Sequence, residues 1–208
     1  MSILDQLASA QDRKDEEPNI QLAQDISDND NHNAIKELVA NLNNKNKAIS
    51  SNCIKVLYEV GERKPALIAD YVDDFVEVLK GKNNRLIWGA MTALGSIASL
   101  KTDKIWAHVE TIIRATENGS AITQDWGIRV LALVSSNNAD YEARIVPFLL
   151  DFLRQCKPKD LPRHAESVIV TIHTDNQADF IKILTDRKPS LRPSPAKRVD
   201  KILKGFND

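Results

Sequence analysis

Apolar positions recur along the chain as a fixed group that returns at a constant distance. The group has the form apolar-x-x-apolar-apolar-x-x-apolar, and this spacing of three or four residues predicts one buried face of a helix. Each full copy begins 37 residues after the one before, and a shortened copy, Phe180/Ile183/Leu184, follows after 34. The full copies are Ile35/Leu38/Val39/Leu42, Val72/Phe75/Val76/Leu79, Val109/Ile112/Ile113/Thr116 and Val146/Leu149/Leu150/Leu153.

A second apolar stripe lies between these groups and keeps the same period. Its copies are Ile20/Ala23, Leu57/Val60, Leu94/Ile97, Leu131/Val134 and Val168/Thr171. Two stripes with one shared period predict repeated helical hairpins, and a hairpin must stack on its neighbours to bury both of its faces. The predicted fold is therefore all-α, an α-α superhelix of stacked antiparallel helix hairpins with a period of about 37 residues.

Turns and helix starts fall between the stripes. Sequences such as Gly81-Lys82-Asn83-Asn84 and Asn118-Gly119-Ser120 are typical of helix ends and turns. Thr123, Asp140 and Asp175 are predicted N-caps, because short polar side chains accept hydrogen bonds from the first backbone N–H groups of a helix.

The two ends of the chain differ from the repeats in charge. Residues 1–17 are acidic, and we expect this segment to fray or to form a loose cap. Residues 18–187 make up the predicted repeat array, and residues 188–208 a basic linker with a C-terminal capping helix. Pro189, Pro193 and Pro195 predict that the linker is extended, and the apolar positions from Ala196 to Phe206 predict the helix.

Composition narrows the class of protein further. The 208 residues carry a formal net charge of −1, which argues against a dedicated nucleic-acid binder. Cys53 and Cys156 lack metal-binding spacing, so we interpret both as small core residues in a reducing compartment. Residues 1–10 do not have the pattern of a signal peptide, and the apolar run 145–153 is too short to span a bilayer. We expect a cytoplasmic protein.

One stretch carries a family resemblance. The run Ala90-Met91-Thr92-Ala93-Leu94-Gly95-Ser96-Ile97-Ala98 resembles the second helix of a HEAT repeat, and the same slot reads Val56-Leu57-Tyr58-Glu59-Val60-Gly61 one repeat earlier. The resemblance to HEAT/armadillo-type α-solenoids covers about residues 18–205. It implies an architecture without a shared chemistry, in which the second helices line a concave groove.

That implication supplies the candidate site. Carried over by the period, positions of the second helices outside the apolar stripe would face the groove, with two Trp residues near its middle. Trp and Arg are enriched in binding hot spots. The alternative is that each Trp packs on the preceding turn as part of the core. The candidate groove residues are Trp88, Thr92, Asp125, Trp126, Arg129 and Arg163.

The C-terminal bases form a second candidate surface. Lys197, Arg198, Lys201 and Lys204 could meet phosphate or an acidic partner, or could be a solvated end cap. The sequence has no phosphate-binding loop, nucleophile motif or paired His ligands, so we expect no catalytic residue, no cofactor and no metal.

The predicted function is that of a non-catalytic scaffold that binds a peptide or helix in the concave groove, with no membrane partner. One alternative is a DNA-binding protein similar to alkyl-base DNA glycosylases of HEAT-like fold, although the balanced charge argues against nucleic acid. A further alternative is a self-assembling repeat protein in which the acidic start meets the basic end of another copy. A monomer is expected, with head-to-tail association as the competing possibility.

Overall fold

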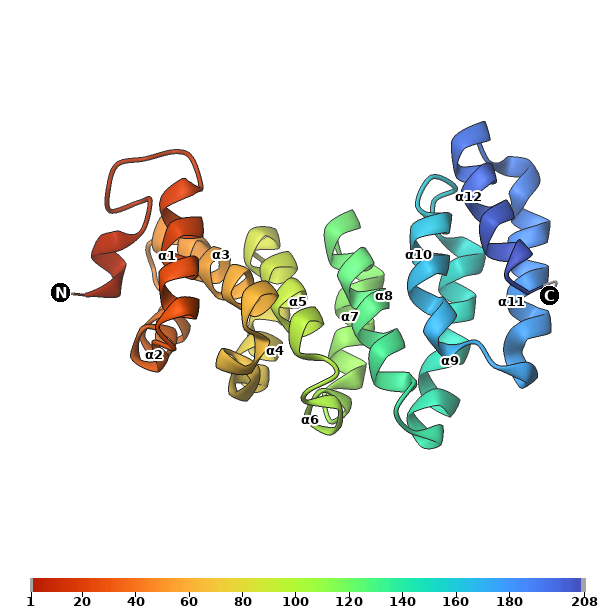
Figure 1. Ribbon diagram of the computed structural model, residues 1–208, viewed down its shortest axis with the longest axis horizontal. Coiled ribbons are helices and arrows are strands. Elements are labelled where there is room, and N and C mark those ends of the chain that lie inside the picture. The colour runs from red at the N-terminus through yellow and green to blue at the C-terminus, as the bar shows by residue number, and fades with distance from the viewer. Residues whose placement is uncertain (1, 207–208) are drawn as a thin grey trace. The chain divides into compact units, whose positions relative to one another are not determined.

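A computed structural model describes residues 2–206, which contain helices and no β-strand (Figure 1). The chain divides into two compact units, Met1–Gly127 and Ile128–Asp208, and the boundary falls within α8. The α-helices are α1 (Glu17–Asp28), α2 (His32–Ala40), α3 (Lys47–Arg63), α4 (Val72–Leu79), α5 (Asn84–Ile97), α6 (Thr102–Trp106), α7 (Val109–Asn118), α8 (Ala121–Ser135), α9 (Ala139–Gln155), α10 (Leu161–Val168), α11 (Thr174–Arg187) and α12 (Pro193–Lys204). Short 3-10 helices are η1 (Ile3–Gln6), η2 (Pro65–Leu67), η3 (Ala69–Tyr71), η4 (Ile169–Thr171) and η5 (Lys188–Ser190).

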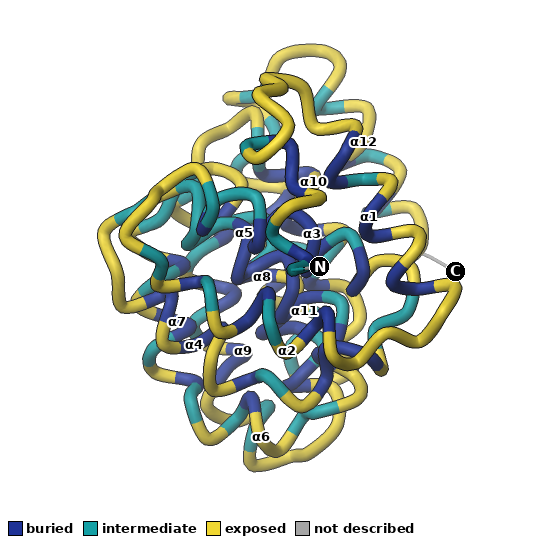
Figure 2. The backbone as a smooth tube through the Cα atoms, turned by 90° about the vertical axis from the view of Figure 1, so that its left-hand side faces the viewer, coloured by how far each residue is buried: buried dark blue, intermediate teal, exposed yellow. Residues whose placement is uncertain are grey.

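Both predicted stripes are buried, which confirms the repeated helix pairs. Every residue of the first stripe is at most 9% exposed, and these residues lie on or directly after α2, α4, α7, α9 and α11, here called the first helices. The second stripe is buried on α1, α3, α5, α8 and α10 with η4, the second helices, except that Ile20 is half-buried. Figure 2 shows the same division along the backbone, with buried positions in the helices and exposed loops between them. The all-α repeat fold is thus the observed one.

In the first unit the second helices pack against one another in order. Helix α1 contacts α3, and α3 contacts α5, while α2 packs on α3 and α4 packs on both α5 and α7. Fully buried side chains such as Phe75, Leu57 and Leu94 fill the space between the helices. Each helix therefore buries its apolar face against neighbouring repeats, as stacking requires.

In the second unit α9 contacts both α10 and α11, and α10 contacts α12. The Phe180 ring of α11 meets the Phe206 ring edge-on, with ring centroids 5.6 Å apart. The Arg187 guanidinium donates hydrogen bonds to the backbone oxygens of Leu153 and Cys156. Since the last carbonyls of a helix have no partner within it, Arg187 caps α9 from the neighbouring helix.

The repeats contain a short helical element that the stripes do not reveal. Helices η2 and η3 precede α4, and α6 precedes α7. Their starts, Pro65 and Thr102, are 37 residues apart, so the element follows the same period. At the corresponding place in the next repeat, α9 begins at Ala139 and continues without a break to Gln155. Segments of three to five residues are too short for a helical stripe to be recognised.

The three predicted N-caps are wrong by two or three residues. The caps are Asn138 for α9 and His173 for α11, and Ser120 accepts a hydrogen bond from the backbone N–H of Thr123. Asp140, Asp175 and Thr123 lie inside the first turn instead. The extended conformation expected at Pro189, Pro193 and Pro195 is also wrong, because Pro189 lies in η5 and α12 begins at Pro193. A proline costs little in a first turn, where its missing N–H would lack an intrahelical partner.

The acidic start of the chain has defined contacts. Leu7 is fully buried, and the backbone N–H of Ala8 donates to the Asn19 carboxamide at 3.1 Å. The Ser2 hydroxyl donates to the Glu37 carboxylate on α2. Within residues 2–206, no helix combines the length and the apolar character needed to cross a bilayer.

Candidate functional site

Two helices of the first unit, α3 and α5, bring an aromatic–cation cluster together, which we define as Lys55, Tyr58, Arg85 and Trp88. The Tyr58 and Trp88 rings of α3 and α5 lie 5.5 Å apart between centroids, tilted by 45°. The Arg85 guanidinium lies 4.2 Å from the centroid of the Trp88 ring, and the Lys55 ammonium 4.9 Å from that of Tyr58. Both distances allow cation–π attraction.

Helix geometry explains why these side chains meet. Lys55 and Tyr58 are three residues apart on α3, and Arg85 and Trp88 are three apart on α5, so each pair shares a helix face. Gly89 lets the two helices approach closely, because a Cβ atom there would lie 2.7 Å from Ile54 Cγ1. The small residue on α5 thereby sets the contact between the two aromatic rings.

Carboxylates surround the cluster and neutralise its cations. Glu59 pairs with Lys55 and with Arg63, each at 2.6 Å, and Glu16, next to α1, pairs with Arg85 at 3.1 Å. Burial would raise the pKa of Glu59, but the hydrogen bonds from Lys55 and Arg63 hold it below its usual value. The carboxylate is therefore ionised at neutral pH, and the site has a mixed charge.

An amide pair extends the cluster toward α1. The Asn19 carboxamide nitrogen donates to Glu16 at 2.9 Å and to the side-chain oxygen of Asn52 on α3 at 3.1 Å. Asn19 itself is fully buried, whereas Asn52 is half-buried. Glu16 bonds both Asn19 and Arg85, so these hydrogen bonds connect groups of α1 and α3 to the cluster and hold its polar part in place.

Of the predicted residues on α8, Asp125 and Trp126 belong to the first unit and Arg129 to the second. The Trp126 ring lies against Gly95 of α5, where an added Cβ would stand 2.5 Å from Trp126 Cε3. Gly95 is seven residues after Trp88, so the two positions share one face of α5, roughly 10 Å apart. Trp126 and Asp125 are half-buried, and Arg129 is exposed. Each Trp thus packs on the preceding second helix and keeps part of its surface open.

Two predicted groove residues have different surroundings. Thr92 is only 3% exposed, and its hydroxyl donates to the Trp88 carbonyl oxygen at 2.9 Å, so we leave it out of the candidate surface. Arg163 belongs to the second unit, where it is exposed on α10 and pairs with Asp160 at 3.1 Å. The aromatic–cation cluster contains neither Thr92 nor Arg163.

All four residues of the predicted basic tail lie on α12. The Arg198 guanidinium donates two hydrogen bonds to the Glu166 carboxylate of α10, at 3.1 and 2.6 Å. Lys197, Lys201 and Lys204 are exposed. Arg198 thus ties α12 to α10, and the three lysines remain on the outer surface of the helix.

Neither cysteine forms a disulfide bond among the described residues. Cys53 is fully buried, and burial raises the pKa of its thiol to about 12. Cys156 is half-buried beside Arg187, with a sulfur-to-nitrogen distance of 3.4 Å, so it is not the plain core residue expected. Between residues 2 and 206, no group of three His, Cys, Asp or Glu side chains could hold a metal ion.

Sequence reasoning missed most of the aromatic–cation cluster. Only Trp88 was predicted, since Tyr58 follows directly on a stripe residue, and Lys55 and Arg85 resemble ordinary surface charges. A signal was present, however: a cation three residues before an aromatic residue occurs at the same face of both α3 and α5.

Comparison with known proteins finds solved structures of similar fold. No family model matches the sequence, and no curated protein matches it. An engineered protein is similar with a TM-score of 0.64 at 18% identity, over 100% of this chain and 97% of that one. A designed armadillo repeat protein in complex with the peptide (KR)4 gives 0.68 at 13% identity, over 89% and 86%. Computationally designed armadillo repeat proteins for modular peptide recognition give 0.66 at 13% identity, over 97% of both chains.

The repeated helix pairs and these likenesses define the class. The chain has an armadillo/HEAT-type helical repeat fold. At such low identities the likeness concerns the fold alone, and the function depends on the side chains at the surface of this chain.

Proposed function

We propose that the chain is a non-catalytic interaction scaffold that binds a peptide or a helix along the face of its second helices. The single observation that carries the proposal is the aromatic–cation cluster, which holds Tyr58, Trp88 and Arg85 from successive second helices against one another. Trp, Tyr and Arg are the residues most enriched in binding hot spots. Peptide recognition by the designed relatives in fold supports the same use of the architecture.

The chemistry of the cluster suits an extended or helical ligand. Trp88 is half-buried, so its ring packs against Tyr58 and still keeps part of its surface accessible. A rigid, partly dry aromatic surface loses little conformational entropy on binding. Arg85 can donate to a ligand carboxylate or carbonyl through the guanidinium edge that Glu16 does not occupy. Asp125 and Trp126, on the part of α8 that belongs to the first unit, extend the proposed surface to the next repeat.

The test is selection of ligands from a random peptide library displayed on phage. Peptides enriched on the chain are then measured against an Arg85→Ala/Trp88→Ala variant, and against Trp126→Ala/Arg129→Ala. Loss of a central aromatic anchor should weaken binding by about 2 kcal/mol, roughly 30-fold in Kd. Leu100→Ala is the matched control, because Leu100 is 54% exposed, three residues past the end of α5, and outside the cluster.

The control should bind the selected peptides within about twofold of the parent chain. Helicity measured by circular dichroism should be unchanged in all variants. The proposal is wrong if no peptide is enriched, or if enriched peptides bind the cluster variants as tightly as the parent chain. Loss of helicity in the Trp126→Ala/Arg129→Ala variant would show that this pair is structural.

A further inference from the structure

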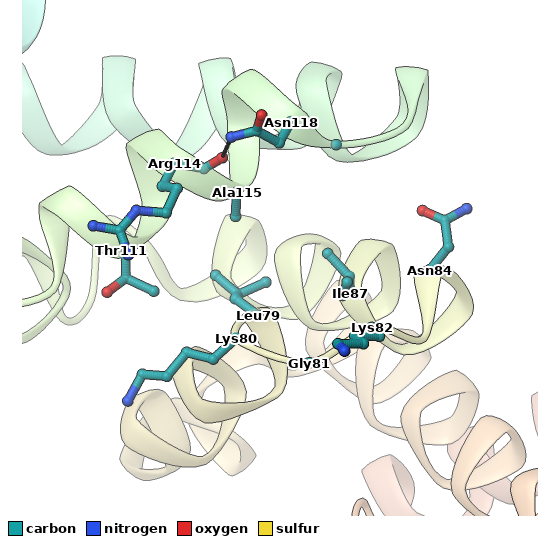
Figure 3. A pocket seen from close by; sticks show the side chains of 11 residues that line it. Leu79, Lys80, Gly81, Lys82, Asn84, Ile87, Thr111, Arg114, Ala115 and Asn118 are labelled. Carbon is teal, nitrogen blue, oxygen red and sulfur yellow. Dashed lines mark hydrogen bonds between the residues drawn. The ribbon is translucent and has the colours of Figure 1, made fainter.

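A separate pocket opens in the first unit where α4 turns into α5 (Figure 3). It has a volume of about 510 Å³ and lies between the end of α4, the start of α5 and the later part of α7. No residue of the aromatic–cation cluster lines it. The pocket is built from the first helices α4 and α7, the loop after α4, and the first turn of the second helix α5, so it adjoins the cluster but has different lining residues.

The floor of this pocket is aliphatic. Figure 3 shows Leu79, Ile87 and Ala115 meeting in the middle, from α4, α5 and α7 in turn. Leu79 is 6% exposed, and Ile87 and Ala115 are half-buried. Such a floor can cover one aliphatic side chain of a ligand and remove it from water.

The rim of the pocket is cationic. Lys80, Lys82 and Arg114 line it, and no carboxylate does. Lys80 pairs with Glu77 at 2.6 Å, but both side chains are more than half exposed, so this pair is weak. Within residues 2–206, Lys82 and Arg114 have no ion pair. When the charge of Glu77 is added to those of Lys80, Lys82 and Arg114, the rim has a net charge of +2.

Amides complete the rim. Asn84 stands at the first turn of α5, and Asn118 lies at the end of α7 on another side of the opening (Figure 3). The Asn118 nitrogen donates to the Arg114 backbone oxygen at 2.9 Å, which fixes the carboxamide. Its oxygen can accept a backbone N–H from a ligand, and the Asn84 amide can donate to a backbone carbonyl.

We propose that this pocket binds an acidic peptide segment, in which one aliphatic side chain enters the floor and flanking carboxylates meet Lys82 and Arg114. The aliphatic floor is complementary to the apolar side chain of such a peptide, and the amides can bond its backbone. The cationic rim is complementary to its carboxylates in charge. A single-stranded nucleic acid suits the pocket less, because no aromatic side chain lines it for base stacking. The site adds a second ligand class and does not depend on the cluster on the second helices.

The experiment uses a fluorescent peptide, Gly-Glu-Glu-Leu-Glu-Glu-Gly, in a polarisation titration of the full chain at low salt. The parent chain should bind it saturably, and added salt should weaken the binding. Lys82→Glu/Arg114→Glu should weaken it by about 10-fold or more, since attraction becomes repulsion at both rim positions. The matched control is Lys36→Glu/Lys47→Glu, which makes the same charge change at exposed positions of α2 and α3 and should stay within about twofold.

A second peptide tests the floor of the pocket. Replacing its Leu by Ser keeps the charge and should weaken binding by about fivefold or more. The proposal is overturned if the parent chain shows no saturable binding, if the control reversal weakens binding as much as the rim reversal, or if the Ser peptide binds equally well. It is also overturned if a single-stranded oligonucleotide of equal charge or inorganic phosphate displaces the peptide at comparable concentration. If the rim reversal loses helicity, Lys82→Gln/Arg114→Gln replaces it.

Discussion

His164 is a buried titratable residue whose environment opposes its charge. It is 2% exposed on α10, and the Phe152 ring meets its imidazole edge-on with centroids 5.4 Å apart. Burial, followed by repulsion from Arg163, lowers the pKa of His164 to about 4. The neutral imidazole is therefore part of the packed core of the second unit at physiological pH.

The lowered pKa predicts a loss of stability in mild acid. The unfolded state binds a proton below pH ~6.5 and the folded state only below ~4, so the free energy of unfolding falls as pH decreases between these values. Between pH 7 and pH 5 the contribution of His164 should be about 2 kcal/mol. Urea denaturation of the parent chain and His164→Gln at both pH values measures the difference.

His32→Gln is the control for this measurement, because His32 is exposed at the start of α2. Its pH dependence should match that of the parent chain. If His164→Gln also keeps the full dependence, the loss in mild acid arises from other groups and His164 is not protected by burial.

For single residues, the sequence predicts on which helix a side chain lies better than it predicts which other side chains it contacts. Trp88 and Trp126 were predicted from the period, and both lie on second helices with part of their surface open. That Trp88 meets Tyr58 and Arg85 depends on side-chain directions across α3 and α5, which the period does not specify. The cap of α9 by Arg187 also joins residues 31 to 34 positions apart and has no local signal.

Between elements, small residues on α5 control how closely the second helices approach. Gly89 faces Ile54 and Tyr58 of α3, and Gly95 faces the Trp126 ring of α8. In an exposed helix, alanine in place of glycine would stabilise by about 0.5–1 kcal/mol. At Gly95, however, the added methyl group would collide with an aromatic ring, so the sign of the effect depends on the neighbour.

We therefore predict that Gly95→Ala lowers the free energy of unfolding by about 1–2 kcal/mol, because overpacking outweighs the gain in helix propensity. In a Trp126→Ala background the collision is absent, and the same change should stabilise the chain by about 0.5–1 kcal/mol. Chemical denaturation of the four chains in this double-mutant cycle provides the measurement. An equal effect of Gly95→Ala in both backgrounds would contradict the contact between α5 and α8.

The hydrophobic period predicted the long elements because each must bury one face against its neighbours. Its limits are equally physical. The short helices η2, η3 and α6 are stabilised by tertiary contacts and are too short to display a stripe of their own. Pro193 and Pro195 were expected to be extended, yet a first helical turn accepts proline without losing a hydrogen bond. The start of each helix depends on which of several neighbouring polar residues acts as the cap, and the hydrophobic period does not identify that residue.

Across the chain, the residues that determine the fold differ from the residues that form the candidate surfaces. The armadillo/HEAT-type fold follows from the repeats and from the solved structures that share it. The aromatic–cation cluster and the cation-rimmed pocket are features of this chain's own side chains. They have no residue in common, although both use α5: Arg85 and Trp88 belong to the cluster, and Asn84 and Ile87 line the pocket.

The central claim is that the second helices present the surface that binds a peptide. The most direct test is to titrate a library-selected peptide into the chain and follow backbone amide shifts by NMR. We predict saturable shifts on α3 and α5 around Tyr58 and Trp88, with little change on α2, α4 and α7. Shifts confined to those first helices, or the absence of saturable shifts, would contradict the claim.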